Sequence, residues 1–245
     1  MLVSQHLSST FFAALLALSA SVHGQTPSEP VCDLEQGKKL LWGEKDSDKR
    51  QSGLAAIRCA AEAGNPESQT YLATLLDAGL GVAKDSREAA AWLEKAASQG
   101  HAPAISRLAF AYLHGIGVRP DKVRARELLM EASKLGDIQA MGNLGAMYGM
   151  GDGVPQSNQL AAEWYRKSAD GGGMNGQIGL ANMLLRGHGV EQDFSACFLY
   201  ASLAARQKHP RAANVASECE ARLSPEERAR VMQQINGWKP KSGTQ

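Results

Sequence analysis

The amino-acid sequence predicts an all-α fold, a right-handed α-solenoid of tandem helix-turn-helix repeats. We expect about five repeats of 36 residues and a C-terminal capping helix. Glycines recur every 36 residues, large apolar residues recur with the same step, and the apolar residues inside each unit follow the period of an α-helix. The recurring positions are Gly79, Gly115, Gly151 and Gly187; Trp92, Leu128, Trp164 and Tyr200; and Leu72, Leu108, Leu144 and Leu180.

Each repeat is expected to contain a helix, a loop, a second helix and a turn. Apolar residues at helical spacing predict a first helix over residues 67–78. The Gly-x-Gly-Val segment that begins at Gly79 ends this helix, because glycine tolerates the positive φ found just past a helix C-terminus. Asp85 is a favoured N-cap for the second helix, and Glu88 completes the spacing of a capping box.

The pattern of the repeat identifies a known family. Leu144-Gly145, Tyr148, Gly151, Gly153-Val154, Ala161-Ala162, Trp164-Tyr165, Lys167-Ser168-Ala169 and Gly171 resemble the Sel-1-like repeat, a relative of the tetratricopeptide repeat. Four full copies cover residues 66–209. A degenerate copy with Lys45-Asp46 in place of Gly-Val precedes them, and a half repeat and a helix from Ser224 to about Asn236 follow.

The chain divides into four expected segments. Residues 1–24 are predicted to be a signal peptide, because a short apolar run from Phe11 to Ala20 precedes Val22 and Gly24 at suitable cleavage positions. The run is too short to span a bilayer, so stable membrane insertion is not expected. Residues 25–33 are a predicted linker, residues 34–238 the solenoid and residues 239–245 a disordered tail. We expect a periplasmic protein, with secretion as the alternative.

Four cysteines in an exported chain indicate disulfides. The predicted pairs are Cys32 with Cys59 and Cys197 with Cys219. The two cysteines of each pair are about equally far from a predicted turn between antiparallel helices. They are therefore expected to lie side by side on the two helices. The alternative for Cys197 is a buried thiol, since alanine stands at its position in the three preceding repeats. No Cys-x-x-Cys spacing is present, so no metal site is predicted.

No motif in the chain points to catalysis or to a cofactor. The formal net charge of +1 gives no indication of a nucleic-acid partner. Walker, His-Glu-x-x-His, Gly-x-Ser-x-Gly and Ser-x-x-Lys motifs do not occur. Resemblance to cysteine-rich family members keeps a β-lactamase or cell-wall-active enzyme as the alternative, but the sequence predicts a non-enzymatic protein without catalytic residues.

Resemblance to tetratricopeptide stacks implies that the first helices of successive repeats line a concave binding face. The expected partner-binding residues are Glu67, Thr70, Thr74, Asp77, Ser106, Phe110, Leu113, His114, Gln139, Met150, Asn175, Asn182 and Arg186. Apolar anchors between charged ends suit a helix or an extended peptide as ligand. The alternative is that Phe110 and Leu113 only pack between repeats.

The expected function is that of a monomeric periplasmic module that binds another protein, as an adaptor or an inhibitor. Family resemblance implies specific versions, among them an immunity protein against a phospholipase effector of the type VI secretion system, or an envelope regulator. A secreted protein that binds a host protein is a further alternative.

Overall fold

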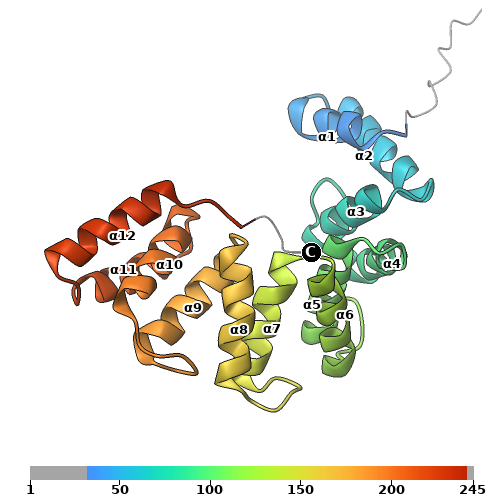
Figure 1. Cartoon of the computed structure of the whole chain (residues 1–245). Helices are drawn as coiled ribbons and strands as arrows, with labels where there is room; N and C mark the ends of the chain where they lie inside the picture. Colours follow the sequence, from blue (N-terminus) through green and yellow to red (C-terminus); the bar gives the residue numbers. More distant parts are fainter. Residues whose placement is uncertain (1–31, 242–245) are drawn as a thin grey trace, which may run out of the picture. The chain divides into compact units, whose positions relative to one another are not determined.

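The structure is a computed structural model that describes residues 32–241. This part of the chain is built of twelve α-helices without a strand (Figure 1). The helices are α1 (Leu34–Gly43), α2 (Ser47–Glu62), α3 (Pro66–Ala78), α4 (Ser86–Ala97), α5 (Ala102–His114), α6 (Lys122–Lys134), α7 (Ile138–Met150), α8 (Asn158–Asp170), α9 (Met174–Arg186), α10 (Phe194–Arg206), α11 (Ala212–Glu220) and α12 (Pro225–Gly237). The predicted signal peptide lies outside the described residues.

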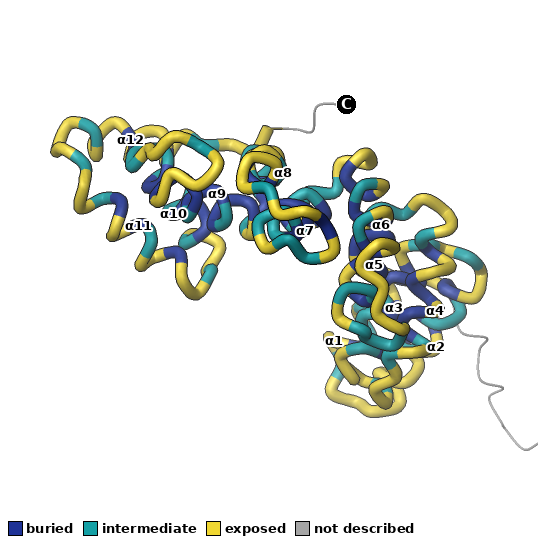
Figure 2. The backbone as a smooth tube through the Cα atoms, turned by 90° about the horizontal axis from the view of Figure 1, so that it is seen from below, coloured by how far each residue is buried: buried dark blue, intermediate teal, exposed yellow. Residues whose placement is uncertain are grey.

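The helices pack in chain order, as a solenoid of helical hairpins requires. The two helices of each pair contact each other, from α1 and α2 to α9 and α10, and each pair contacts the next through α2 and α3, α4 and α5, α6 and α7, α8 and α9, and α10 and α11. Buried residues lie on the sides of the helices that face one another, as the dark blue segments in Figure 2 show. The predicted all-α solenoid is therefore confirmed.

Glycine has two different roles in the loop between the helices of a repeat. The first glycine, such as Gly79 or Gly115, has a φ of 67° or 68° and forms the C-cap of the first helix. The second glycine lies against the preceding repeat. A Cβ at Gly117 would overlap the Ser86 carbonyl, and one at Gly189 would overlap the backbone of Asn158. The loop glycines therefore set both the helix end and the distance between repeats.

The predicted N-cap at Asp85 is confirmed, and the same position in the three following repeats is an N-cap as well. Asp85, Asp121, Ser157 and Asp193 each accept a hydrogen bond from a backbone N–H in the first turn of their helix. The predicted capping box at Asp85 is wrong. The Glu88 carboxylate instead accepts hydrogen bonds from Arg58 and from the Trp92 indole, so it links two repeats. A capping box does form at Ser224 and Glu227.

Both predicted disulfides are present, and none of the four cysteines is free. The Cα atoms of Cys32 and Cys59 are 4.9 Å apart, and those of Cys197 and Cys219 are 6.0 Å apart. The alternative of a buried thiol at Cys197 is therefore wrong. One disulfide ties the start of α1 to α2, and the other ties α10 to α11.

The C-terminal capping helix is present as α12, which packs against α10 and buries Val231 and Ile235. Residues 239–241, where the sequence predicts the start of a disordered tail, follow this helix. The Lys241 backbone N–H donates to the Asp170 carbonyl oxygen at 2.8 Å, and its ammonium lies 2.7 Å from the Asp170 carboxylate. This double contact ties the chain after α12 to the end of α8.

Candidate functional site

The acidic residues predicted on the first helix of the second repeat make contacts within the chain. Glu67 is exposed and lies 3.6 Å from the Lys38 ammonium. Asp77 accepts a hydrogen bond of 2.7 Å from the Ser86 hydroxyl, and the Thr74 hydroxyl donates to the Thr70 carbonyl oxygen. This end of the predicted face is therefore engaged mainly with its own chain.

Two predicted binding residues, Thr70 and Ser106, are buried, with exposed fractions of 7% and 6%. The Thr70 hydroxyl donates to the Pro66 carbonyl oxygen and lies 2.9 Å from Nδ1 of His101. The equivalent residues Gly142 and Ile178 are buried too. This position of the repeat faces the next repeat rather than solvent, so the prediction that Thr70 and Ser106 line an open face is wrong.

Two of the predicted binding residues are large apolar side chains that are open to solvent. Phe110 on α5 is 47% exposed, and Met150 at the end of α7 is 71% exposed. The Phe110 ring lies 4.2 Å from the His114 ring, centroid to centroid. Leu113 is half-buried against the core, so packing between repeats explains Leu113 but leaves Phe110 available to a partner.

A groove of about 520 Å³ lies over α7 and α9 and is the candidate site. Four of the predicted residues line it, namely Met150, Asn175, Asn182 and Arg186. It also takes in residues that sequence reasoning missed: Asn143, Tyr165, His188, His209 and Arg211. The predicted residues Glu67, Thr74, Asp77, Phe110, Leu113, His114 and Gln139 lie outside this groove.

Glycines shape the floor of the groove. The Tyr165 ring, from α8, lies between α7 and α9, and a methyl group added at Gly145 or Gly179 would come within 2.6 or 2.5 Å of it. Gly142 and Gly149 of α7 also line the groove. The sequence does carry a signal for this arrangement, because Tyr165 replaces the Leu93 and Leu129 of earlier repeats where Gly145 replaces alanine.

The charged side chains in the groove are all basic. Arg186, Arg211, His188 and His209 line it, whereas no Asp or Glu does. Neither Arg186 nor Arg211 has an ion pair within the described residues. Burial and, second, the charge of Arg211 lower the pKa of His209. His209 therefore adds little positive charge to the groove at neutral pH, whereas its two arginines are charged.

Several side-chain types common in catalytic sites are missing from the lining of the groove. Ser, Thr, Cys, Asp, Glu and Lys are all missing from its lining, so it holds neither a side-chain nucleophile of these types nor a carboxylate base. Across residues 32–241, no cluster of His, Cys, Asp and Glu could hold a metal ion. None of the described helices is long and apolar enough to cross a membrane.

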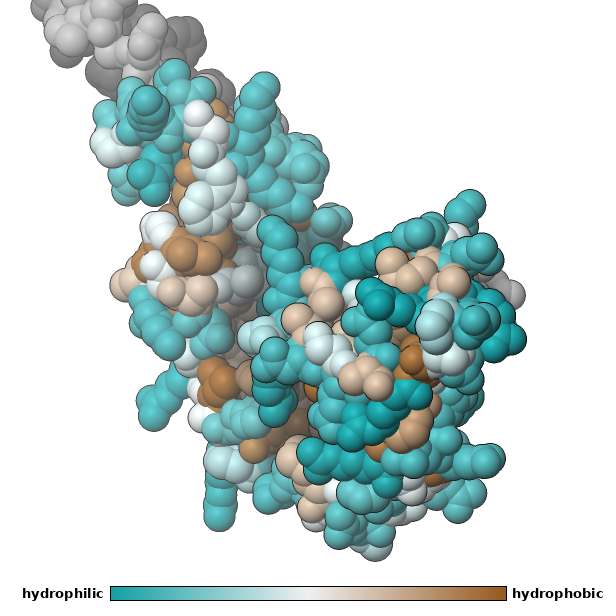
Figure 3. Space-filling view, turned by 90° about the vertical axis from the view of Figure 1, so that its left-hand side faces the viewer, coloured by the Kyte–Doolittle hydropathy of each residue, from teal (hydrophilic) through white to brown (hydrophobic). Residues whose placement is uncertain are grey.

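The apolar surface is divided into small areas. On the side of the molecule shown in Figure 3, apolar residues form small patches among hydrophilic ones instead of one broad area. Anchoring at a few apolar side chains, such as Phe110 and Met150, is consistent with such a surface.

Solved structures with the same architecture include a protective antigen of uropathogenic Escherichia coli strains with an SLR fold (29% identity, TM-score 0.67). That alignment covers 83% of this chain and 44% of the other, so this chain spans less than half the length of the E. coli protein. A Sel1 repeat protein from Oxalobacter formigenes is 24% identical, with 83% of this chain and 85% of that chain covered and a TM-score of 0.70. Immunity protein Pa5087 from Pseudomonas aeruginosa is 20% identical, with 74% and 83% covered and a TM-score of 0.43.

No match to a curated protein is found. The model of the Sel1 repeat matches residues 66–101, 102–137, 138–173 and 175–209, which together are more than half of the chain. These are the four units that contain α3 to α10 and the loops between them. The chain therefore belongs to the Sel1 repeat family.

Proposed function

We propose that this protein is a non-catalytic module that binds another protein on the surface formed by α5, α7 and α9. The observation that carries the proposal is the open groove over α7 and α9, with the exposed Met150 at its edge. Large apolar side chains that stay exposed next to a concave surface are typical anchors for a protein partner. Phe110 offers a second anchor on the preceding first helix.

The compartment we propose is the periplasm. Two disulfides in a chain of this size indicate an oxidising environment, and the predicted signal peptide is consistent with export. In that compartment the specific role we propose is that of an adaptor or inhibitor of another envelope protein. Immunity against an incoming effector is one form of this role.

A pull-down from envelope extract of the source bacterium tests the proposal, with the mature chain as bait and both disulfides intact. The bait is compared with the variant Phe110→Ala/Met150→Ala and with the control Val123→Ala/Leu160→Ala. The control removes two exposed apolar side chains from the second helices α6 and α8. We expect one stoichiometric partner that the control retains and the Phe110/Met150 variant loses. A partner retained by all three baits would contradict the proposed surface.

A further inference from the structure

The groove over α7 and α9 contains two arginines whose charge is not balanced by the chain. Arg186 is the last residue of α9, and Arg211 directly precedes α11. Other arginines of the described chain do form ion pairs, for example Arg58 with Glu88 and Arg228 with Glu220. Since the groove has no acidic lining residue, the two guanidiniums offer all their donors to a ligand.

Neutral hydrogen-bond donors line the same groove as these two arginines. The Tyr165 hydroxyl has no hydrogen-bond partner within residues 32–241, and burial of the ring raises its pKa, so it is a neutral donor at physiological pH. The side chains of Asn143 and Asn175 form no hydrogen bond with the described chain either, and both line the groove. Arginine, tyrosine and amide N–H groups together match the acceptor oxygens of a carboxylate.

The shape of the groove favours an extended ligand. Its α7 side is lined by Gly142, Ala146 and Gly149, which lets a peptide backbone come close. In an extended segment alternate side chains point the same way, so every second residue reaches the floor.

We propose that this groove binds an extended segment of a partner protein through acidic side chains, with Arg186 and Arg211 pairing with carboxylates and Tyr165 donating from the floor. This inference rests on the proposed protein-binding function and adds the chemistry of the partner. Charge complementarity selects the occupant, because a basic or neutral segment would leave both arginines without a counter-charge.

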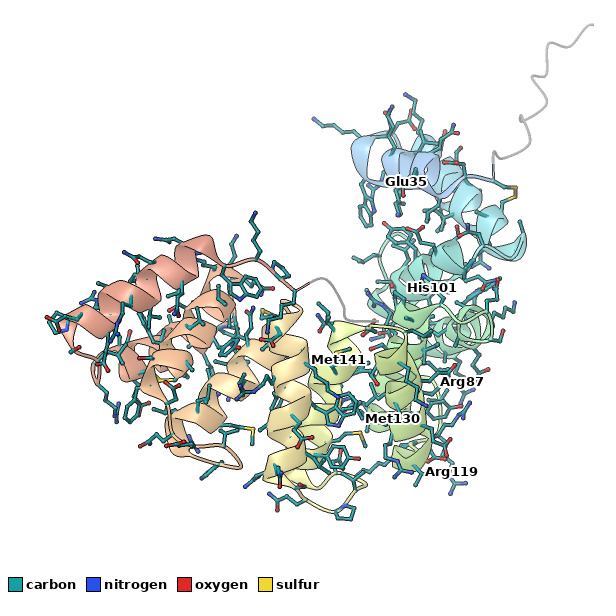
Figure 4. All side chains as sticks on the ribbon, in the orientation of Figure 1. Glu35, Arg87, His101, Arg119, Met130 and Met141 are labelled. Atoms are coloured by element: carbon teal, nitrogen blue, oxygen red, sulfur yellow. A yellow bond between two sulfur atoms is a disulfide. The ribbon has the colours of Figure 1, made fainter. Side chains whose placement is uncertain are left out.

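Calorimetric titration of the mature, disulfide-bonded protein with two synthetic peptides tests this chemistry. One peptide alternates glutamate with serine, the other has glutamine in place of glutamate, and both are acetylated and amidated so that only side chains differ in charge. The protein variants are Arg186→Gln/Arg211→Gln and Tyr165→Phe. The control Arg87→Gln/Arg119→Gln removes the same charge from exposed arginines, which Figure 4 shows beyond α6 on the side away from α7.

We expect the glutamate peptide to bind at least about ten-fold more tightly than the glutamine peptide, since a charge-assisted hydrogen bond contributes that much. The Arg186/Arg211 variant should lose this preference and Tyr165→Phe should weaken it, whereas the Arg87/Arg119 control should keep it. Equal binding of the two peptides, or no binding of either, would overturn the inference.

The pull-down separates this inference from the broader proposal. A partner that is lost with the Phe110/Met150 variant but kept by the Arg186/Arg211 variant would leave the binding function standing and remove the acidic ligand. A glutamate preference in the titration, together with a partner that the Phe110/Met150 variant still binds, would support the acidic ligand. It would contradict the proposed role of Phe110 and Met150 in binding that partner.

Discussion

Glutamine occupies the same position in two repeats, but only in one of them does its side-chain amide nitrogen form a hydrogen bond. Gln69 and Gln177 are both buried, and each accepts a hydrogen bond, from Gln99 and Gln207 respectively. The Gln69 amide also donates to the Ala61 carbonyl oxygen, whereas the Gln177 amide nitrogen has no partner. A buried donor without a partner destabilises the folded state.

We predict that Gln177→Met is about 1 kcal/mol more stable than Gln69→Met, because both variants lose the hydrogen bond from a neighbouring glutamine but only Gln177→Met removes an unsatisfied donor. The preceding repeat has methionine at this position, Met141, so the fold accepts this side chain. The matched control is Gln69→Met, which should destabilise the protein because it also removes the hydrogen bond to Ala61. Urea unfolding of the three proteins measures both effects, and equal shifts in the two variants would contradict the explanation.

A second prediction at this scale concerns alkaline pH. Burial first, and a hydrogen bond to Asp170 second, raise the pKa of Tyr200 to about 12 from an ordinary value of 10.0. The folded state therefore favours the neutral phenol, and its contribution to stability is complete below pH 10 and lost as the pH rises towards 12. We expect the free energy of unfolding to fall less over this range in Tyr200→Phe than in the unmodified protein, by urea titration at each pH. Parallel curves would contradict the assignment.

At the scale of elements, the candidate site depends on how α8 packs between α7 and α9. The Tyr165 ring occupies space that exists only because Gly145 and Gly179 have no side chain. Glycine inside a helix reduces helix stability by about 1 kcal/mol relative to alanine, so helix propensity alone favours alanine at both positions. Packing against Tyr165 opposes that preference.

We predict that Gly179→Ala destabilises the protein by about 1–3 kcal/mol, because the added methyl group overlaps the Tyr165 ring. The second substitution Tyr165→Leu, which restores the residue type of Leu93 and Leu129, should recover most of that loss. Gly43→Ala is the control, since a side chain there meets no atom within 4 Å. A double-mutant cycle by thermal unfolding measures the coupling, and additive effects would show that ring and glycine do not interact.

The helix ends could be predicted from short stretches of sequence. The candidate site could be predicted only in part, because it depends on packing between repeats. The loop glycines and N-cap residues act within a few residues of themselves, so helix ends such as Asp85 and Gly79 could be identified from the sequence. The burial of Thr70 and Ser106 depends on the following repeat, which a helical phase alone does not describe. Arg211 reaches the groove from outside the full repeats, so spacing gave no indication of it.

In the whole molecule each repeat contacts mainly its neighbours, and the disulfides join α1 to α2 near one end and α10 to α11 near the other. Stability in such a stack is local, so an end can open while the centre stays folded. The first hairpin lacks the Gly-x-Gly-Val loop and relies on close packing of Gly37 against Gly53 and on the disulfide of Cys32 and Cys59.

Removal of the disulfide between Cys32 and Cys59 should therefore destabilise only the N-terminal end of the stack. We predict that Cys32→Ala/Cys59→Ala destabilises the first hairpin by about 2–4 kcal/mol. Amide hydrogen exchange should accelerate in α1 and α2 and stay unchanged in α7 to α9. Faster exchange throughout residues 34–237 would contradict local stability and indicate one cooperative unit.

Site-specific photo-crosslinking can locate a partner protein bound in the groove over α7 and α9. A photoreactive phenylalanine analogue is placed at Met150, on the rim of the groove, or at Leu160, an exposed apolar position on α8 outside it. We expect a covalent adduct with one envelope protein from position 150 and none from position 160. An adduct from position 160 alone, or from neither position, would contradict it.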